Sequence, residues 1–353
     1  MARSRIYLDH AATSPLRPEA KAAMEEGFAI WANPSSPHAE GRKAKQALED
    51  ARARVKAALG WDGEVIFTSG ASEAAGLARA WSRMDYQILS TVEHDAIRSP
   101  IFGAKSIYAE LPVGPDGYPS LSSLGQELSE GAKHEESALV VVQHVNSETG
   151  TVQDIASLND AVRSYQGVLL VDCAQSSGKI PLPDCDMAIV SAHKFGGPIG
   201  VGALLVRDFQ LMDAPGGQER GYRRGTENLP DILGMAAALD AGGMESWATN
   251  EAERSAFVDC MDEFRVGPGE KLDTIFALAH PTMSAQAQLI RLDAMGFAVS
   301  AGSACSSGTL KKSRVLDAFG VPDDVAARTI RVSMGWSTTP EELDAFAEAW
   351  ASL

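Results

Sequence analysis

The sequence predicts an α/β protein whose main sheet is mostly parallel or mixed and is covered by helices on both faces. Between about residues 60 and 210, short β-rich apolar runs alternate with polar, helix-like or glycine-rich stretches. Several runs are almost continuously apolar, which is typical of strands buried on both faces. From about residue 244 the pattern changes, and a smaller α+β domain is expected there. Ligands of such sheets bind at the carboxyl ends of the strands.

The predicted strands are residues 64–68, 86–91, 138–145, 168–172, 187–191 and 202–206. Residues 38–60 predict a surface helix, because apolar residues form one stripe along it and Gly60 ends it. A long charged helix is expected from about Met244 to Arg265, and a capping box with a first-turn proline predicts a terminal helix over 340–351. Residues 215–228, rich in glycine and arginine, are expected to form an ordered functional loop.

Composition and charge exclude several classes of function. The 353 residues include 31 Lys and Arg against 47 Asp and Glu, a formal net charge of −16, so the average surface repels nucleic-acid backbones and anionic lipids. No apolar run reaches the ~18 to 20 residues of a membrane span. Because the start of the chain lacks a secretory pattern, we expect a cytoplasmic protein that binds neither nucleic acid nor membrane. No metal-ligand set is apparent, and the four cysteines form no C-x-x-C pair.

Two successive predicted strands are followed by residues that suit one cofactor. Asp172 ends the run 168–172, and Lys194 follows the run 187–191. An aspartate can pair with a protonated pyridine nitrogen, and a lysine can form a Schiff base with an aldehyde cofactor. The pair therefore indicates pyridoxal phosphate. Taken alone, the two residues also fit an N-cap aspartate and a solvated lysine.

Further candidates lie at the ends of other predicted strands. Residues 69–72 connect a strand to a helix, an arrangement that binds phosphate through backbone N–H groups, although a serine there can also be only a cap. His94 could stack on a flat ring and carry protons near neutral pH, with a structural histidine as the alternative. Arg331 could clamp a carboxylate, with an ordinary surface arginine as the alternative. The remaining candidates are Ser191 and His193 for phosphate, and Asn146 and Gln175 for a ring hydroxyl.

Cys305 lies in a segment of small, polar residues, SAGSACSSG, at positions 300–308. That composition is typical of an exposed thiol on a mobile loop, whereas free cysteines are usually buried as small hydrophobes. Cys173, Cys185 and Cys260 are expected to be structural or incidental. Cys305 is therefore the candidate nucleophile.

Taken in order, these motifs resemble the pyridoxal-phosphate cysteine desulfurases of the class V aminotransferase family, the NifS- and IscS-like enzymes. The resemblance covers nearly the whole chain and rests on the blocks YLDHAATSP, NPSSPH, FTSGASEA, EHDAI, HVNSETGTVQDI, VDCAQSSGK, SAHKFGGPIGVGAL, GGQERGYRRGTEN and SAGSACSSG. The combination of SAHK with GSACSSG is specific to desulfurases that carry the catalytic cysteine on a long loop. The chain departs from the family at Ala75 and Gly76, where many relatives have two asparagines, and at 146–150, where NSETG replaces NNEIG.

The resemblance implies a fold type I pyridoxal-phosphate enzyme with a mainly parallel seven-stranded sheet. It implies a large domain of residues 15–245 and a small domain of residues 1–14 and 246–353, with the cysteine loop at about 300–312. Lys194 would bind the cofactor covalently, Asp172 would pair with the ring nitrogen, Gln175 would meet the ring oxygen, and His94 would stack on the ring and carry a proton. The phosphate would be bound by Ala71, Ser72, Ser191 and His193, with Thr226 from a neighbouring subunit, and the substrate carboxylate by Asn33, Asn146 and Arg331.

The implied reaction converts L-cysteine to L-alanine, and Cys305 takes the sulfur as a persulfide for iron–sulfur cluster or thiolation pathways. The implied partners are a second copy of the chain in a homodimer and a sulfur acceptor or iron–sulfur scaffold protein. Two alternatives stay open. One is a related pyridoxal-phosphate lyase or aminotransferase, such as a selenocysteine lyase, and the other is an inactive sulfur-relay partner that uses the Cys305 loop.

Overall fold

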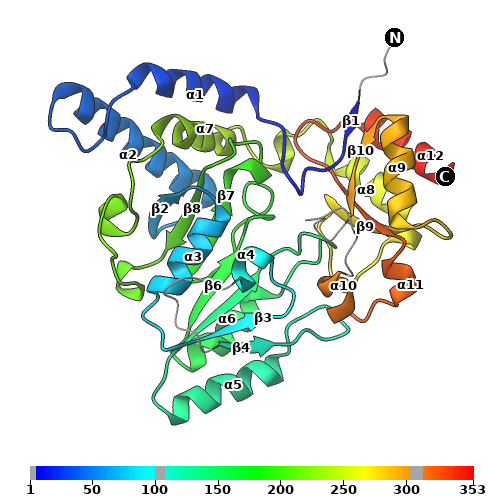
Figure 1. Cartoon of the computed structure of the whole chain (residues 1–353), viewed down its shortest axis with the longest axis horizontal. Coiled ribbons are helices and arrows are strands. Elements are labelled where there is room, and N and C mark those ends of the chain that lie inside the picture. The colour runs from blue at the N-terminus through cyan, green and yellow to red at the C-terminus, as the bar shows by residue number, and fades with distance from the viewer. Residues whose placement is uncertain (1–4, 100–107, 302–312) are drawn as a thin grey trace.

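The computed structural model describes residues 5–99, 108–301 and 313–353, and within these ranges its largest sheet has seven strands (Figure 1). Their order across the sheet is β2 (Glu64–Thr68), β8 (Gly202–Val206), β7 (Met187–Ser191), β6 (Val168–Asp172), β5 (Ala138–Gln143), β3 (Tyr86–Ser90) and β4 (Tyr108–Leu111). All run in one direction except β8, which is antiparallel to both of its neighbours. The predictions of an α/β fold and of a mainly parallel sheet are confirmed.

Successive side chains of each central strand point to opposite faces of this sheet, and both faces are apolar. Helices therefore cover both faces. In β6, Leu169 and Val171 belong to one apolar cluster, and Leu170 belongs to another. The first face carries α2 (Ala39–Leu59), α5 (Leu121–Lys133), α6 (Ile155–Ser164) and α7 (Leu229–Asp240), with α1 (Pro18–Ile30) packed outside α7. The second face carries α3 (Ala71–Trp81) and α4 (Asp95–Arg98).

The ends of the predicted helices test the capping signals. Helix α2 ends where expected, since Gly60 adopts the left-handed conformation at φ +63°. Helix α12 (Pro340–Ala351) begins with the predicted capping box of Thr339 and Glu342. The long helix predicted from Met244 is wrong. A short 3₁₀ turn is followed by α8 (Glu251–Met261), because Asn250 and Glu253 form a second capping box that starts a new helix.

A separate apolar cluster lies beside the main sheet, on the right of Figure 1. It includes Leu8, Phe257 and Phe276, which come from segments far apart in the sequence. Around it lie β9 (Ile275–Ala279), β11 (Ser300–Ala301) and β12 (Thr329–Ser333) in one antiparallel sheet, β1 (Ile6–Tyr7) paired with β10 (Phe297–Ala298), and the helices α8, α9 (Ala285–Met295) and α12. Two short helices, α10 (Arg314–Ala318) and α11 (Asp323–Ala326), lie between α9 and β12 in the chain.

The residues after β1 connect this cluster to the main sheet. Leu8 accepts a hydrogen bond from the backbone of Ser333 on β12, and Ser14 donates one to the carbonyl of His193, just after β7. The segment between them therefore crosses the carboxyl end of the main sheet. No helix in the described ranges is both long enough and apolar enough to cross a bilayer.

Candidate active site

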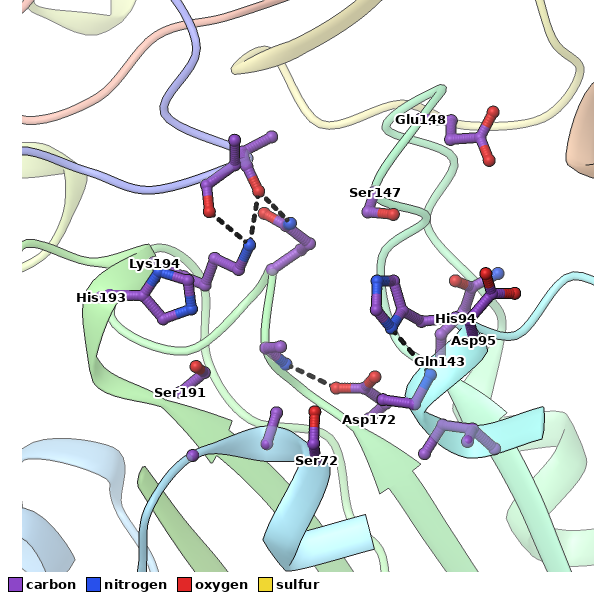
Figure 2. A pocket seen from close by; sticks show the side chains of 18 of the residues that line it. Ser72, His94, Asp95, Gln143, Ser147, Glu148, Asp172, Ser191, His193 and Lys194 are labelled. Atoms are coloured by element: carbon purple, nitrogen blue, oxygen red, sulfur yellow. Dashed lines mark hydrogen bonds between the residues drawn. The ribbon is translucent and has the colours of Figure 1, made fainter. Parts of the chain in front are cut away.

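A cavity of about 790 Å³ opens where the carboxyl ends of the central strands meet the segment after β1 (Figure 2). Most of the predicted site residues line it: Ala71, Ser72, His94, Asp172, Gln175, Ser191, His193, Lys194 and Arg331. Asn146 is buried but is not part of the lining, and Asn33 and Thr226 are exposed on the chain outside the cavity. Cys305 lies outside the described residues.

Lys194 follows β7 in the 3₁₀ turn Ala192–Lys194, and its side chain reaches across to the segment after β1. Its Nζ donates to the carbonyl oxygens of Ala11, at 2.7 Å, and Ala12, at 2.8 Å. Burial and the positive charge of Arg331 lower the pKa of the amine to about 8. A substantial fraction of the amine is therefore neutral near physiological pH, as Schiff-base formation requires.

Asp172 occupies the end of β6, at the bottom of the cavity. Its Oδ1 accepts a hydrogen bond of 2.9 Å from the backbone N–H of Ala174. Burial raises the pKa of the carboxyl, while that hydrogen bond and the charges of His94 and Lys194 oppose the rise. A cationic group placed against this carboxyl would keep it ionised.

The first turn of α3 forms one wall of the cavity, and Figure 2 shows Ser72 facing inward. The N-cap residue of α3, Gly70, has φ +145° and has no side chain that could cap the helix. N–H groups of the first turn are therefore left for a ligand. Gly70 lies against β8, since a Cβ on Gly202 would be 2.8 Å from Gly70 Cα. Such a turn with positive φ and close backbone contact requires glycine.

Ser191 ends strand β7 and His193 follows it in the 3₁₀ turn, and both line the cavity together with this end of α3. Ser191 is buried, and the Nδ1 atom of His193 is 3.1 Å from Thr13 Oγ1. Burial and the charge of Lys194 lower the pKa of His193 to about 4, so the ring is neutral at pH 7. A serine hydroxyl, a neutral imidazole and a helix N-terminus together form a suitable environment for a phosphate.

His94 lies across the cavity from Lys194 in Figure 2. It is the N-cap of α4, and its Nδ1 accepts a hydrogen bond of 3.1 Å from the N–H of Ala96. A neutral ring in this arrangement carries its proton on Nε2. Arg314 on α10 holds the residues just before His94 in place. Its guanidinium donates to the carbonyl of Thr91 and to the carbonyl of Glu93, the latter at 2.7 Å.

Arg331 projects from β12 at the other side of the cavity. One terminal nitrogen donates to Asp9 Oδ1 at 2.9 Å, and the other donates to the carbonyl of Ser147 at 3.0 Å. Its Nε is buried without a hydrogen-bond partner. The other oxygen of Asp9 accepts a hydrogen bond of 2.7 Å from Ser300. The guanidinium is thus fixed and retains a donor for a carboxylate ligand.

Several cavity residues were not singled out by sequence reasoning. Glu93 is fully buried, its Oε1 accepts from the N–H of Gln143 at 2.8 Å, and its Oε2 has no partner. Burial and the charge of Asp172 raise the pKa of Glu93 well above its usual value. Glu148 accepts a hydrogen bond of 2.6 Å from Ser313, and burial raises its pKa as well. Their positions in the sequence could have indicated these glutamates, because each lies shortly after a strand that ends at the cavity.

The cysteines that the structure describes do not supply a nucleophile for this cavity. Cys173 and Cys185 are buried, and burial raises the pKa of the Cys173 thiol and raises that of Cys185 to about 12. Cys260 is exposed on α8. None of the three lines the cavity. The described residues also contain no group of His, Cys, Asp or Glu side chains placed to bind a metal ion.

The residues of the cavity fit pyridoxal phosphate. The uncapped N-terminus of α3 suits its phosphate, the carboxylate of Asp172 suits the ring nitrogen, and the Lys194 amine is bonded to backbone carbonyls and remains open to an aldehyde. These groups come from neighbouring strand ends, where such a sheet binds ligands. Fold and cavity together define a pyridoxal-phosphate enzyme of fold type I.

Comparison with known proteins places the chain within this class. The aminotransferase class V family model matches residues 6–346. The chain is 33% identical to the cysteine desulfurase IscS of Dictyoglomus turgidum, over 97% of this chain and 92% of that protein, and 35% identical to a cysteine desulfurase of Cereibacter sphaeroides, over 98% and 94%.

Solved structures give the same result. A NifS-like protein from Rickettsia africae has a TM-score of 0.84 at 29% identity, covering 99% of both chains. The structure of SspA in complex with cysteine has a TM-score of 0.79 at 28% identity, covering 94% of this chain and 99% of that one. The chain belongs to the class V aminotransferase family and, within it, to the cysteine desulfurases, which are pyridoxal-phosphate enzymes.

Proposed function

We propose that this chain converts L-cysteine to L-alanine and passes the sulfur to an acceptor through a persulfide on Cys305. The observation that carries the proposal is the convergence of Lys194, Asp172 and Arg331 on one cavity. Lys194 provides an amine that can react with an aldehyde, and Asp172 provides a carboxylate that can pair with a protonated ring nitrogen. Arg331 provides a guanidinium that can bind the carboxylate of an amino acid. The family membership of the chain supports the same reaction.

The proposed roles follow from the chemistry and the protonation of the side chains that line the cavity. When bound, pyridoxal phosphate supplies an electron sink for bonds broken at the substrate Cα and Cβ. Lys194 binds the cofactor and, once the substrate has displaced it, removes the Cα proton, for which an amine with a pKa of about 8 is suited. Asp172 holds the proton on the ring nitrogen, and Gln175 donates to the ring oxygen. His94 stacks on the ring and carries a proton for the thiol.

Arg331 is proposed to bind the substrate carboxylate, together with Asn146. The Oδ1 atom of Asn146 accepts from the backbone N–H groups of Glu148, at 2.9 Å, and Thr149, at 3.0 Å, while its Nδ2 is buried without a partner. The amide therefore has a donor to offer on this side of the site. Asn33, which is exposed and outside the lining of the cavity, is proposed to assist these two residues.

Sulfur transfer is proposed to occur at Cys305. Its thiolate attacks the substrate sulfur, the Cβ–S bond breaks with its electron pair left on carbon, and the sulfur remains on Cys305 as a persulfide. The carbon fragment takes up a proton and leaves as L-alanine. The step is balanced without an external oxidant, because cysteine is reduced to alanine while Cys305 is oxidised to the persulfide level.

We also propose the assembly in which these steps occur. Residues 15–245 form the large domain, and residues 1–14 and 246–353 form the small domain, a division supported by the separate apolar cluster around Leu8, Phe257 and Phe276. Thr226 is exposed and would reach the phosphate of a second subunit in a homodimer. A sulfur acceptor or iron–sulfur scaffold protein, and a cytoplasmic location, belong to the same proposal.

The proposal is tested with purified protein loaded with pyridoxal phosphate and given L-cysteine and a reductant. Alanine and sulfide are expected in equal amounts. Lys194→Ala is expected to lose both the absorbance of the bound Schiff base and turnover, whereas Lys45→Ala, an exposed lysine on α2, is expected to keep both. Full activity of Lys194→Ala, or a protein that releases no alanine from L-cysteine, would overturn the proposal.

A further inference from the structure

Lys179 is a buried lysine that the proposed reaction does not use. It lies in the turn region after β6, is only 8% exposed, and its Nζ donates to Gln175 Oε1 at 3.4 Å. Burial and the positive charges of Lys194 and Arg331 lower its pKa to about 7. A buried ammonium beside two cations destabilises the fold, so stability does not explain a lysine at this position.

His10, another titratable group that interacts with Lys179, does not compensate the charge of the lysine. His10 is buried between Ser14 and Thr338, and burial together with the charge of Lys179 lowers its pKa to about 3. The imidazole is therefore neutral at pH 7. The hydrogen bond to Gln175 connects Lys179 directly to a residue that lines the cavity.

Gln175 links Lys179 to the group that binds the cofactor. Its Nε2 donates to the carbonyl of Ala11 at 2.9 Å, and the same carbonyl accepts from Lys194 Nζ at 2.7 Å. The two ends of an amide have nearly the same shape, so the partners decide which end lies where. The protonated amine of Lys179 can only donate, and the Ala11 carbonyl can only accept. Both partners therefore select one orientation, with Oε1 toward Lys179 and Nε2 toward the Ala11 carbonyl.

We propose that Lys179 is a positioning residue that holds the Gln175 amide with its N–H group, and not its carbonyl, toward the ring oxygen of the cofactor. The inference rests on the proposed function, because it takes the ring oxygen as the partner of Gln175. A flipped amide would place two oxygen lone pairs against each other at the cofactor. The charge of Lys179 strengthens the hold, since a hydrogen bond from a charged donor is stronger than one from a neutral donor.

Lys179→Met tests the proposal, because methionine has a similar length and no donor. The dissociation constant of pyridoxal phosphate from the apoprotein is expected to rise about tenfold or more. The absorbance spectrum of the bound cofactor is also expected to change, because it responds to hydrogen bonding at the ring oxygen. The melting temperature is expected to stay equal or to rise, since a buried charge is removed.

Two further variants serve as controls. Ser177→Ala alters the same turn, where the Ser177 hydroxyl donates to the carbonyl of Cys173 at 2.8 Å, and it is expected to change cofactor affinity by less than about twofold. Lys179→Gln keeps an N–H donor and is expected to retain affinity within a few-fold of the parent. It tests the same point if the methionine variant does not fold.

A double-mutant cycle with Gln175→Ala separates positioning from a general structural role. If Lys179 acts through Gln175, Lys179→Met is expected to change cofactor affinity by less than about twofold in the Gln175→Ala background. Additive effects, or an unchanged affinity and spectrum in Lys179→Met, would overturn the inference alone. A parent apoprotein that binds no pyridoxal phosphate would overturn the proposed function and the inference together.

Discussion

Burial and the charges of individual residues around Lys194 together set the reactivity of its amine. Arg331 and Lys179 are cations of the same site, and Asp9 and Asp172 are the anions that oppose them. Burial is the largest effect and the positive charge of Arg331 adds to it, so the amine loses its proton far more easily than an exposed lysine does. The amine proposed to react with an aldehyde is therefore partly neutral near physiological pH in the structure without the cofactor.

Cofactor capture by the apoprotein is expected to depend on pH, because the pKa of Lys194 is lowered to about 8. The neutral amine reacts, so the capture rate, followed by absorbance, is expected to rise with pH through about 8 and then to level off. Arg331→Met removes a positive charge and leaves Asp9 without its partner, and both changes favour the protonated amine. The midpoint is therefore expected to move up. A parent midpoint near the ordinary lysine value of 10.5, or a downward shift in the variant, would contradict the account.

Asp172→Asn tests the role of a single negative charge at the bottom of the cavity. The substitution keeps the shape of the side chain but removes the charge that stabilises a proton on the ring nitrogen. Cofactor capture by Lys194 is expected to persist, while turnover is expected to fall by about a hundredfold or more. Asp154→Asn, at the N-cap of α6, is the matched control for turnover. Near-parental turnover of Asp172→Asn would refute the pairing with the ring.

Among the secondary-structure elements, α3 and β8 depend on each other to keep the phosphate end of the cavity open. The turn before α3 approaches β8 so closely that there is no room for a side chain on Gly202. A Cβ there would lie 2.5 Å from the carbonyl of Val190 and 2.8 Å from Gly70 Cα. Strand and helix therefore fix the position of the N–H groups that face the ligand.

Gly202→Ala is expected to destabilise the protein by about 1 to 3 kcal/mol and to weaken cofactor binding, because it pushes the start of α3 away from β8. Thermal unfolding and a cofactor titration measure the two effects. Gly76→Ala is the control on the same helix, where a Cβ has no atom within 4 Å. It is expected to stabilise the protein by up to about 1 kcal/mol without changing affinity. A tolerated Gly202→Ala would contradict the tight contact.

The elements that sequence reasoning could predict are those with strong local signals. The central strands are short apolar runs, and the ends of α2 and α12 have a glycine or a capping box. The break before α8 also had a local signal, the pair Asn250 and Glu253, but the charged residues on both sides resemble one continuous helix. Lys194 and Asp172 could be predicted because parallel strands bring their ends to one edge of the sheet.

In the whole molecule, contacts between distant segments complete the site, and local patterns cannot predict them. Asp9 and Arg331 are 322 positions apart, and Glu148 and Ser313 are 165 apart. Such pairs depend on how the second apolar cluster lies against the main sheet. Sequence reasoning therefore predicted Arg331 as a candidate clamp for a carboxylate but did not predict Asp9, the aspartate that binds its guanidinium.

Arg314 provides a test of this long-range support. Arg314→Met removes the hydrogen bonds from α10 to the carbonyls of Thr91 and Glu93, which hold the turn before His94. Backbone amides of α4 are expected to exchange with solvent about tenfold faster, while those of β6 stay unchanged. Arg328→Met, whose parent side chain bonds the carbonyls of His280 and Pro281, is expected to leave α4 unaffected. Unchanged exchange of α4 in Arg314→Met would contradict the support.

The most direct test of the central claim is alanine formation from L-cysteine by the parent protein and by Cys305→Ala, both loaded with pyridoxal phosphate. The account predicts that the parent forms alanine and gains a sulfur atom on the peptide that contains Cys305, as measured by mass spectrometry. The variant is expected to bind the cofactor and to form no alanine. Equal alanine formation by both proteins would contradict the account and would favour a related pyridoxal-phosphate lyase that needs no cysteine nucleophile.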